Sequence, residues 1–263
     1  MKLAVLSISG GLDSTCLLLK LLSEGYTVRC YSFNYGQKHI IEQEKLRNNL
    51  SFLINKGFDI QLQVIDLRDC FSDSQSSLHQ GGEAIPEGHY QDENMKSTVV
   101  ENRNVIFSAI VYGKALSLAK KYDTNVEIFL GIHKGDSTCY PDCTEESRFA
   151  CENAFKISNW DSDKISYQAP FVNLDKIDVL KEGIYAMDFL NFSKREQADI
   201  INNTWSCYKG PDKDGNPCNR CGTCCERNLA LYCNGLESLI EGDNKEFFKE
   251  VCEKEITEHA KRG

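Results

Sequence analysis

Near its N-terminus the chain reads Ser7-Ile8-Ser9-Gly10-Gly11-Leu12-Asp13-Ser14-Thr15, between the apolar run Leu3–Leu6 and a leucine-rich stretch. This order predicts a strand, a tight glycine turn and the first turn of a helix. Glycines let the backbone approach an anion closely, and a helix N-terminus offers unpaired N–H groups and a partial positive charge. We therefore expect phosphate or pyrophosphate to be bound by Ser9, Gly10, Gly11, Asp13 and Ser14.

This loop differs from the Walker phosphate loop, because no Gly-Lys-Ser or Gly-Lys-Thr ends it. Its residues Ser9–Ser14 resemble the SGGxDS loop of the PP-loop ATP pyrophosphatases, which bind ATP and cleave it between the α and β phosphates. An ordinary strand-to-helix turn, capped by Asp13 or Ser14, is the simpler alternative. Six matching positions at the start of the first predicted helix favour the phosphate loop over that turn.

The composition is typical of an intracellular enzyme. A chain of 263 residues can form one α/β domain with a small appended module. No apolar run approaches the ~20 residues of a membrane span, and a cleaved signal peptide would remove the first motif. We therefore expect a cytoplasmic protein without membrane contact. The net charge of −9 argues against direct nucleic-acid binding, and thirteen cysteines without an export signal indicate thiols and metal ligands instead of disulfides.

Strands and helices alternate over the first half of the sequence. The predicted strands are Leu3–Ile8, Thr27–Asn34, Ile60–Asp66 and Val126–Gly131. The predicted helices are Asp13–Ser23, Ile40–Leu53, Asn104–Ala119 and Cys143–Ile157. This alternation predicts an α/β fold with a doubly wound, mostly parallel sheet, whose ligands bind beyond the carboxyl ends of the strands.

Composition also predicts one domain boundary, one lid and one solvated helix. A change to Cys, Gly, Asn and Pro near residue 200 divides the chain into an ATP-binding domain, 1–200, and a C-terminal metal-binding region, 201–263. The polar stretch 68–98 is long for a loop and predicts a lid that orders over bound substrate. The charged tail after Glu241 predicts a solvated helix.

The last segment carries a metal-binding pattern. Cys218, Cys221 and Cys224 are separated by two residues each, and Cys207 precedes them. Four thiolates satisfy a tetrahedral Zn²⁺, which would stabilise a loop-rich segment with a small core. An iron–sulfur cluster also takes four thiolates, and the additional Cys225 and Cys233 keep that alternative open.

Three further stretches accompany these motifs. They read Phe33-Asn34-Tyr35-Gly36-Gln37-Lys38-His39, then Thr98-Val99-Val100-Glu101-Asn102-Arg103-Asn104, then Gly131-Ile132-His133-Lys134-Gly135-Asp136 followed by Tyr140-Pro141-Asp142-Cys143. Together with the SGGLDS loop, the cysteines and Glu226-Arg227, they make residues 3 to 230 resemble the 7-cyano-7-deazaguanine synthase (QueC) family. The resemblance implies an adenine-nucleotide α-hydrolase-like (PP-loop) fold with a small C-terminal zinc-binding helical region, and a homodimer.

The family converts 7-carboxy-7-deazaguanine, ATP and ammonia to the nitrile precursor of queuosine, and the resemblance implies this ligase activity with Mg²⁺ beside the phosphates. It implies catalytic roles for Asp13, Lys38, Arg103 and Asp136, with Arg103 also binding ATP. Substrate-binding roles fall on Gln37, His39, Asn104, Tyr140 and Asp142. Each polar residue has a simpler alternative: Asn104 and Asp136 as caps or turn residues, His39 and Lys38 as solvated surface groups.

Two positions depart from the family's usual pattern. Glu101 replaces a proline, and Thr144 replaces an arginine that Arg148 would have to supply from one helical turn on. Such changes fit a QueC-like paralogue of an antiphage system, of the type IV CBASS kind, that conjugates the deazaguanine to a partner protein's N-terminus. A PP-loop tRNA sulfurtransferase would also use ATP and cysteines, but it would need a basic or RNA-binding face. A non-catalytic nucleotide sensor would need neither Asp13 nor the downstream motifs.

Overall fold

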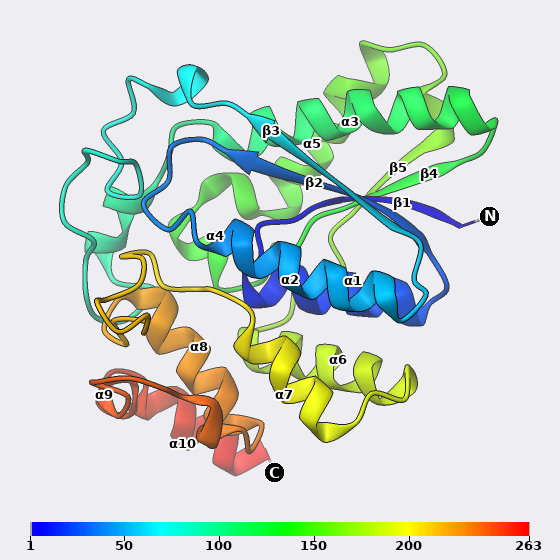
Figure 1. Ribbon diagram of the computed structural model, residues 1–263. Coiled ribbons are helices and arrows are strands. Elements are labelled where there is room, and N and C mark those ends of the chain that lie inside the picture. Colours follow the sequence, from blue (N-terminus) through cyan, green and yellow to red (C-terminus); the bar gives the residue numbers. More distant parts are fainter. Residues whose placement is uncertain (1, 263) are drawn as a thin grey trace.

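The computed structural model describes residues 2–262 and shows a five-stranded parallel sheet with helices on both faces (Figure 1). The strand order is β3-β2-β1-β4-β5, and every neighbouring pair is parallel. The strands are β1 (Leu3–Ser7), β2 (Thr27–Asn34), β3 (Ile60–Asp66), β4 (Val126–Phe129) and β5 (Ile165–Gln168). The predicted doubly wound fold is confirmed. The fifth strand was not predicted, because four residues are too few to show an alternating pattern.

The helices form a layer on each side of the sheet. Figure 1 shows α3 and α5 over one face and α1, α2, α6 and α7 over the other. The helices are α1 (Leu12–Ser23), α2 (Glu42–Asn55), α3 (Arg103–Tyr122), α4 (Asp136–Cys139), α5 (Glu145–Ile157), α6 (Lys176–Phe189), α7 (Lys194–Asn202), α8 (Gly222–Cys233), α9 (Phe247–Val251) and α10 (Glu253–Arg262). Within residues 2–262, no helix has the length and apolar character needed to cross a membrane.

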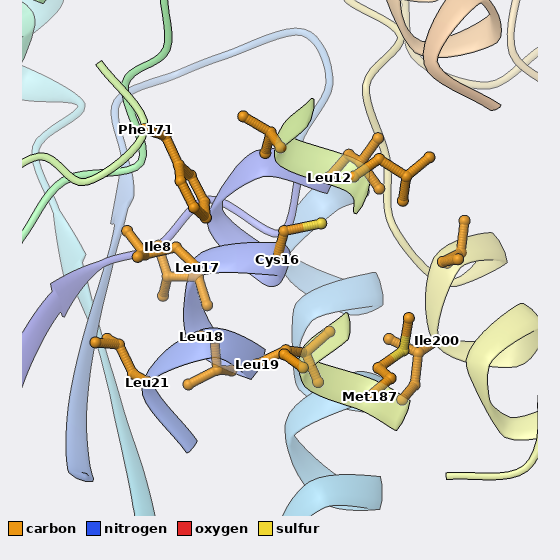
Figure 2. Packing of buried hydrophobic residues seen from close by; sticks show 14 of the residues in the cluster. Ile8, Leu12, Cys16, Leu17, Leu18, Leu19, Leu21, Phe171, Met187 and Ile200 are labelled. Carbon is orange, nitrogen blue, oxygen red and sulfur yellow. The ribbon is translucent and has the colours of Figure 1, made fainter. Parts of the chain in front are cut away.

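Side chains of the central strand β1 pack against helices on both faces of the sheet. Leu3 and Val5 pack with α3 on one face, whereas Ala4 and Leu6 pack with α1, α6 and α7 on the other. Successive side chains of a strand point to opposite faces, so a strand covered on both sides is apolar throughout. Figure 2 shows the second of these cores, where the leucines of α1 meet Phe171, Met187 and Ile200.

The C-terminal region packs onto this same core. Cys225, Leu229 and Leu231 of α8 lie in one hydrophobic cluster with α1 and α6, and Phe248 of α9 is fully buried there. The tail is therefore not wholly solvated, in contrast to the sequence expectation, because α9 contributes an apolar anchor. The division at residue 200 stays a prediction, since side chains from both ranges share a cluster.

The stretch 68–98 is folded against the body of the molecule. It contains two 3₁₀ turns, Asp69–Phe71 and Glu93–Thr98, and side chains such as Leu78 and Met95 are buried. Isolated β-bridges join this stretch to Gln37 and to Cys221. It lies beside the carboxyl ends of the strands (Figure 1), where the chain leaves β1 for one side of the sheet and β4 for the other. Ligands of open α/β sheets bind at such a switch point.

Candidate active site and cysteine cluster

The loop after β1 holds itself in shape through its two serines. Ser9 Oγ accepts a hydrogen bond from the Gly11 amide (3.1 Å) and lies 3.3 Å from Ser14 Oγ. Ser14 Oγ in turn donates to the Gly11 carbonyl (3.3 Å). Among the described residues no side chain caps α1 at Gly11. The first N–H groups of α1 and both hydroxyls therefore face the space in which an anion would lie.

Gly10 is required by the path of the chain. Its φ of +100° is in the region that disfavours other residues, and an added Cβ would lie 2.3 Å from the Glu42 carbonyl oxygen. The backbone of the loop therefore passes directly against the start of α2. No other residue fits this close approach without moving α1 or α2.

A cavity of about 230 Å³ opens beyond these strand ends. We call its side made by Ser7, Ile8, Ser9 and Ser14 the phosphate wall. A second part of the lining, here the assembled wall, consists of Tyr35, His39, Arg103, Tyr140 and Tyr208. A cavity that combines anion donors with flat aromatic rings suits a nucleotide or another heterocycle carrying a phosphate or carboxylate.

Arg103 supplies the cationic charge of the assembled wall. It is the only Arg or Lys among the described residues that line this cavity. The guanidinium donates to Tyr35 Oη (3.3 Å) and to Asn104 Oδ1 (3.2 Å) and lies 5.5 Å from the Tyr35 ring centre. These contacts fix the fork of the guanidinium, so less entropy is lost when it binds an anion.

The pKa values of His39 and Glu42 are both shifted in the direction that favours the neutral side chain. Burial, together with the nearby Arg103 cation, lowers the pKa of His39 to about 3, so its imidazole is neutral at pH 7. Burial raises the pKa of Glu42 to about 7, although hydrogen bonding from Gln37 and the Arg103 charge act against this shift. The site therefore offers a neutral imidazole for hydrogen bonding to a ligand.

A buried charge cluster lies under the phosphate wall. We use this name for Asp13, His133, Asp136, Lys176 and Glu226. Lys176 Nζ is 3.1 Å from Asp13 Oδ2 and 2.8 Å from Glu226 Oε2. Burial would lower the pKa of Lys176, but Asp13, Glu226 and Asp136 together raise it above its usual value, so the ammonium is fully charged at pH 7.

His133 completes this cluster with a defined proton position. Its Nδ1 accepts from the Gly135 amide (3.0 Å), which leaves the proton on Nε2, 3.6 Å from Asp136 and 3.7 Å from Glu226. Burial opposes a charged imidazole, yet the carboxylates of Asp136, Glu226 and Asp13 raise the pKa of His133. The cluster is thus a set of three carboxylates held by one ammonium and one histidine.

No role in the site was predicted from the sequence for Lys176, His133 or Glu226. Lys176 follows the Asp175 cap of α6, after the strand that was not predicted. A lysine in the first turn of a helix after a parallel strand was a usable signal, since such a helix begins at the ligand edge of the sheet. The aromatic residues Tyr35, Tyr90 and Tyr208 were also missed as cavity lining.

Most predicted site residues reach the cavity. The lining includes Ser9, Ser14, His39, Arg103, Asn104, Asp136 and Tyr140. Gly10 and Gly11 form the loop itself, and Asp13 lies in the charge cluster below it. The structure thus brings these residues into one region, and their individual roles stay predictions.

Three predicted residues lie elsewhere. Gln37 is fully buried and bonds the backbone of Phe33 and Tyr35, so it shapes the loop after β2. Lys38 Nζ donates to the Gly82 and Glu83 carbonyls, which ties it to the stretch 68–98. Asp142 lines a small adjoining cavity with Asn104 and Arg148.

The two departures from the family pattern have local roles. Ser74 Oγ donates to the carboxylate of the exposed Glu101 (2.8 Å). Thr144 caps α5 by accepting from the Ser147 amide (3.1 Å). Arg148 is bound to Glu145, Glu152 and a backbone carbonyl, so its charge is neutralised beside α5 and does not replace an arginine at position 144.

The four cysteines of the C-terminal pattern converge as predicted. The sulfur atoms of Cys207, Cys218, Cys221 and Cys224 all lie within 4.8 Å of one another. The amides of Arg220 and Cys221 point at Cys218 Sγ (3.5 and 3.4 Å). Sulfurs this close, with backbone N–H groups directed at them, fit a tetrahedral thiolate site. All thirteen cysteines are free thiols, as the sequence indicated.

Comparison with known proteins gives consistent matches over the chain. The sequence model described as "Queuosine biosynthesis protein QueC" matches residues 3–235. A 7-cyano-7-deazaguanine synthase of Caldicellulosiruptor bescii is 37% identical over 238 residues, covering 90% of this chain and 96% of the relative. The 7-cyano-7-deazaguanine synthase 2 of Colwellia psychrerythraea is 34% identical over 242 residues, covering 92% and 99%.

Among solved structures the similarity is more distant. A crystal structure of a 4-thiouridine synthetase–RNA complex with bound ATP gives a TM-score of 0.46 at 15% identity, covering 95% of this chain and 52% of that one. A predicted tRNA methyltransferase subunit of Methanocaldococcus jannaschii gives 0.40 at 14% identity, covering 70% and 75%.

Proposed function

The chain belongs to the QueC family, and from this premise we propose that it is an ATP-dependent ligase making 7-cyano-7-deazaguanine. Its substrates are 7-carboxy-7-deazaguanine, ATP and ammonia. The two relatives described in the preceding subsection are named 7-cyano-7-deazaguanine synthases, and this chain aligns with nearly the whole length of each. The products are the 7-amide first and then the 7-nitrile.

One observation carries the proposal: a single cavity is lined by both the phosphate wall and the assembled wall, and the assembled wall contains the Arg103 cation. The phosphate wall suits the triphosphate of ATP, because amides of a helix N-terminus and two hydroxyls face it. The ring of Tyr35 and the guanidinium of Arg103 suit a flat base with a carboxylate. The two reactants would therefore meet between the walls.

The chemistry requires a better leaving group than hydroxide. An oxygen of the substrate carboxylate attacks the α-phosphorus of ATP, the bond to the bridging oxygen breaks, and pyrophosphate leaves. Ammonia then attacks the activated carbonyl carbon, AMP leaves and a proton is lost, which gives the amide. With a second ATP the amide oxygen is activated in the same way, and departure of AMP with loss of the two amide protons gives the nitrile.

The described residues have distinct tasks in these steps. Ser9, Ser14 and the α1 amides would hold the departing pyrophosphate, with Lys176 below them as the nearest buried ammonium. Arg103 would orient the substrate carboxylate and neutralise charge on the α-phosphate. The neutral His39 is a hydrogen-bonding partner for the base.

The donors for two metal ions are also present. Asp13 Oδ1 is buried and, within residues 2–262, has no hydrogen-bond partner, which suits a Mg²⁺ shared with the phosphates of ATP. Such an ion would spread the negative charge of the leaving pyrophosphate. The four cysteines would give Zn²⁺ four protein ligands and no open position, so the ion there would be structural.

The direct test is mass spectrometry of a reaction containing the protein, 7-carboxy-7-deazaguanine, MgATP and ammonium chloride. We expect nitrile to accumulate over many turnovers with formation of AMP. Arrest at the amide or at a bound adenylate would overturn the synthase and point to an acceptor protein. Absence of AMP formation with this substrate would overturn the choice of substrate.

A pair of arginine variants ties the reaction to this cavity. Arg103→Met removes the only cation of the assembled wall and should slow nitrile formation by about 10²- to 10³-fold, as loss of a fixed charge donor does. Arg195→Met is the control, because Arg195 is 91% exposed on α7 and should leave the rate unchanged. Equal rates for both variants would place the chemistry elsewhere.

A further inference from the structure

A second group of metal-type ligands lies outside the cavity and outside the cysteine cluster. The donor atoms of His89, Cys252 and Glu255 all lie within 4.8 Å of one another. His89 Nε2 and Glu255 Oε1 are 3.1 Å apart, and the Cys252 side chain is 2% exposed. Two of the three residues lie beyond the range 3–235 that the family pattern matches.

The spacing suits a common metal ion. Two ligands bound tetrahedrally to Zn²⁺ at about 2.0–2.1 Å are roughly 3.3 Å apart, which is close to the His89–Glu255 distance. The Cys252 sulfur lies within 4.8 Å of both other donor atoms, the same limit that the four sulfurs of the cysteine cluster meet. Nitrogen, sulfur and one carboxylate oxygen form a donor set that Zn²⁺ accepts.

The three residues also share a cavity. A space of about 350 Å³ is lined by all of them, and its lining also includes Lys176 and Glu226 of the buried charge cluster. Three protein ligands leave one position of a tetrahedral ion open, and here that position would face the cavity. The group is therefore accessible to an ion from solvent.

From this arrangement we propose a second divalent metal site, formed by His89 Nε2, Cys252 Sγ and Glu255 Oε1, that binds Zn²⁺. On binding, the Cys252 thiol gives up its proton to solvent and the His89–Glu255 contact opens to admit the ion. The ion joins the C-terminal helix α10 to the segment that carries Tyr90. Tyr90 Oη donates to Asp136 (2.9 Å), so the site is one step from the charge cluster.

An ordinary ion pair between His89 and Glu255 is the competing explanation. It accounts for the 3.1 Å contact, and core packing accounts for the burial of Cys252, so neither requires an ion. Only a metal site makes the sulfur, the imidazole and the carboxylate act together, with their donor atoms within 4.8 Å of one another. Both side chains are partly exposed, at 23% and 35%, where such a pair alone stabilises little. The two explanations differ in whether Cys252 takes part in binding an ion.

The test is titration of the purified full-length protein, with zinc retained in the cysteine cluster, by Co²⁺ and then by competing Zn²⁺. We expect one Co²⁺ to bind with a thiolate-to-metal charge-transfer band and to be displaced by Zn²⁺. Cys252→Ser should abolish the band, whereas Glu255→Gln and His89→Gln should weaken Co²⁺ binding at least about tenfold. Glu258→Gln is the control, since Glu258 lines the same cavity but is not a ligand.

Two results would overturn the site. One is a parent protein that shows no thiolate band with Co²⁺. The other is unchanged Co²⁺ affinity in both Glu255→Gln and His89→Gln. These two positions are partly exposed, so their variants keep the test decisive even if the buried Cys252→Ser change disturbs folding.

Discussion

The two walls of the cavity are built in different ways. The phosphate wall comes from one short stretch, in which Ser9 and Ser14 hydrogen-bond across five positions. The assembled wall joins distant segments: Arg103 contacts Tyr35 and Tyr140 contacts Tyr208, and each pair is separated by 68 residues. The first wall is thus a local motif and the second a product of the whole fold.

This difference separates general chemistry from specificity. A local loop can be carried on many proteins, because its shape depends on its own glycines and hydroxyls. A wall made from distant segments changes whenever packing changes, so we propose that substrate preference resides there. The variants below test how independent the phosphate wall is, and how far the assembled wall depends on individual groups.

The largest expected effect comes from Lys176→Met, which tests whether the phosphate wall stands without distant support. The change leaves Asp13 and Glu226 buried without their ammonium and should reduce the free energy of unfolding by about 4 kcal/mol. Urea denaturation measures it. The control is Lys20→Met, since Lys20 pairs with Glu24 and Glu182 at the surface and should cost about 1 kcal/mol or less. Equal losses would show that the cluster does not support the loop.

Gly10→Ala tests the contact between the loop and α2. A methyl group here would meet the Glu42 carbonyl at 2.3 Å as well as adopt a φ of +100°, so we expect a loss of about 3 kcal/mol. Gly25→Ala isolates the cost of φ, because Gly25 has a φ of +81° and no atom within 4 Å among the described residues. That control should lose about 1 kcal/mol in the same denaturation experiment. A similar loss for both would mean that the close approach is unimportant.

Glu42→Gln tests the charge state of the Glu42 carboxyl, which lines the cavity beside the assembled wall, through the pH dependence of stability. Because the pKa of Glu42 is raised from 4.5 to about 7, the native protein binds more protons than the unfolded chain between these values. The contribution of Glu42 to stability therefore falls as pH rises through this window. Relative to the parent, the variant should gain about 2 kcal/mol between about pH 5 and about pH 7.

The measurement is urea denaturation of parent and variant at several pH values. The parent protein supplies the reference free energy of unfolding at each pH. A constant difference between the two proteins would show that Glu42 is ionised throughout the range. His39 would then be the one neutral titratable side chain of this pair at pH 7.

Thr144→Ala has the smallest expected effect and tests whether this departure from the family pattern belongs to the site. Loss of the cap on α5 should cost about 1 kcal/mol of unfolding free energy and leave the rate of nitrile formation unchanged. Thr144→Ser keeps the hydroxyl and should stay close to the parent in both measurements. A large loss of rate at unchanged stability would place Thr144 among the substrate-binding residues.

Much of the fold was predictable from periodicity. Four strands and the main helices of the first half follow from apolar runs and glycine turns, and β2 and β3 agree with the predicted bounds. Strand β5 was missed because it is four residues long. The buried role of the stretch 68–98 was also missed, because its few apolar residues, such as Leu78, are scattered among polar ones.

The glycine-rich loop Ser9–Ser14 and the cysteine cluster could be predicted from the sequence alone, because the interacting atoms of each are carried on a few closely spaced residues. Long-range packing, in contrast, brings Lys176 to Asp13, directs Lys38 to the stretch 68–98 and makes His39 neutral. Electrostatic contacts and burial depend on which segments the fold brings together. Those distances have no signature in the spacing of residues along the chain.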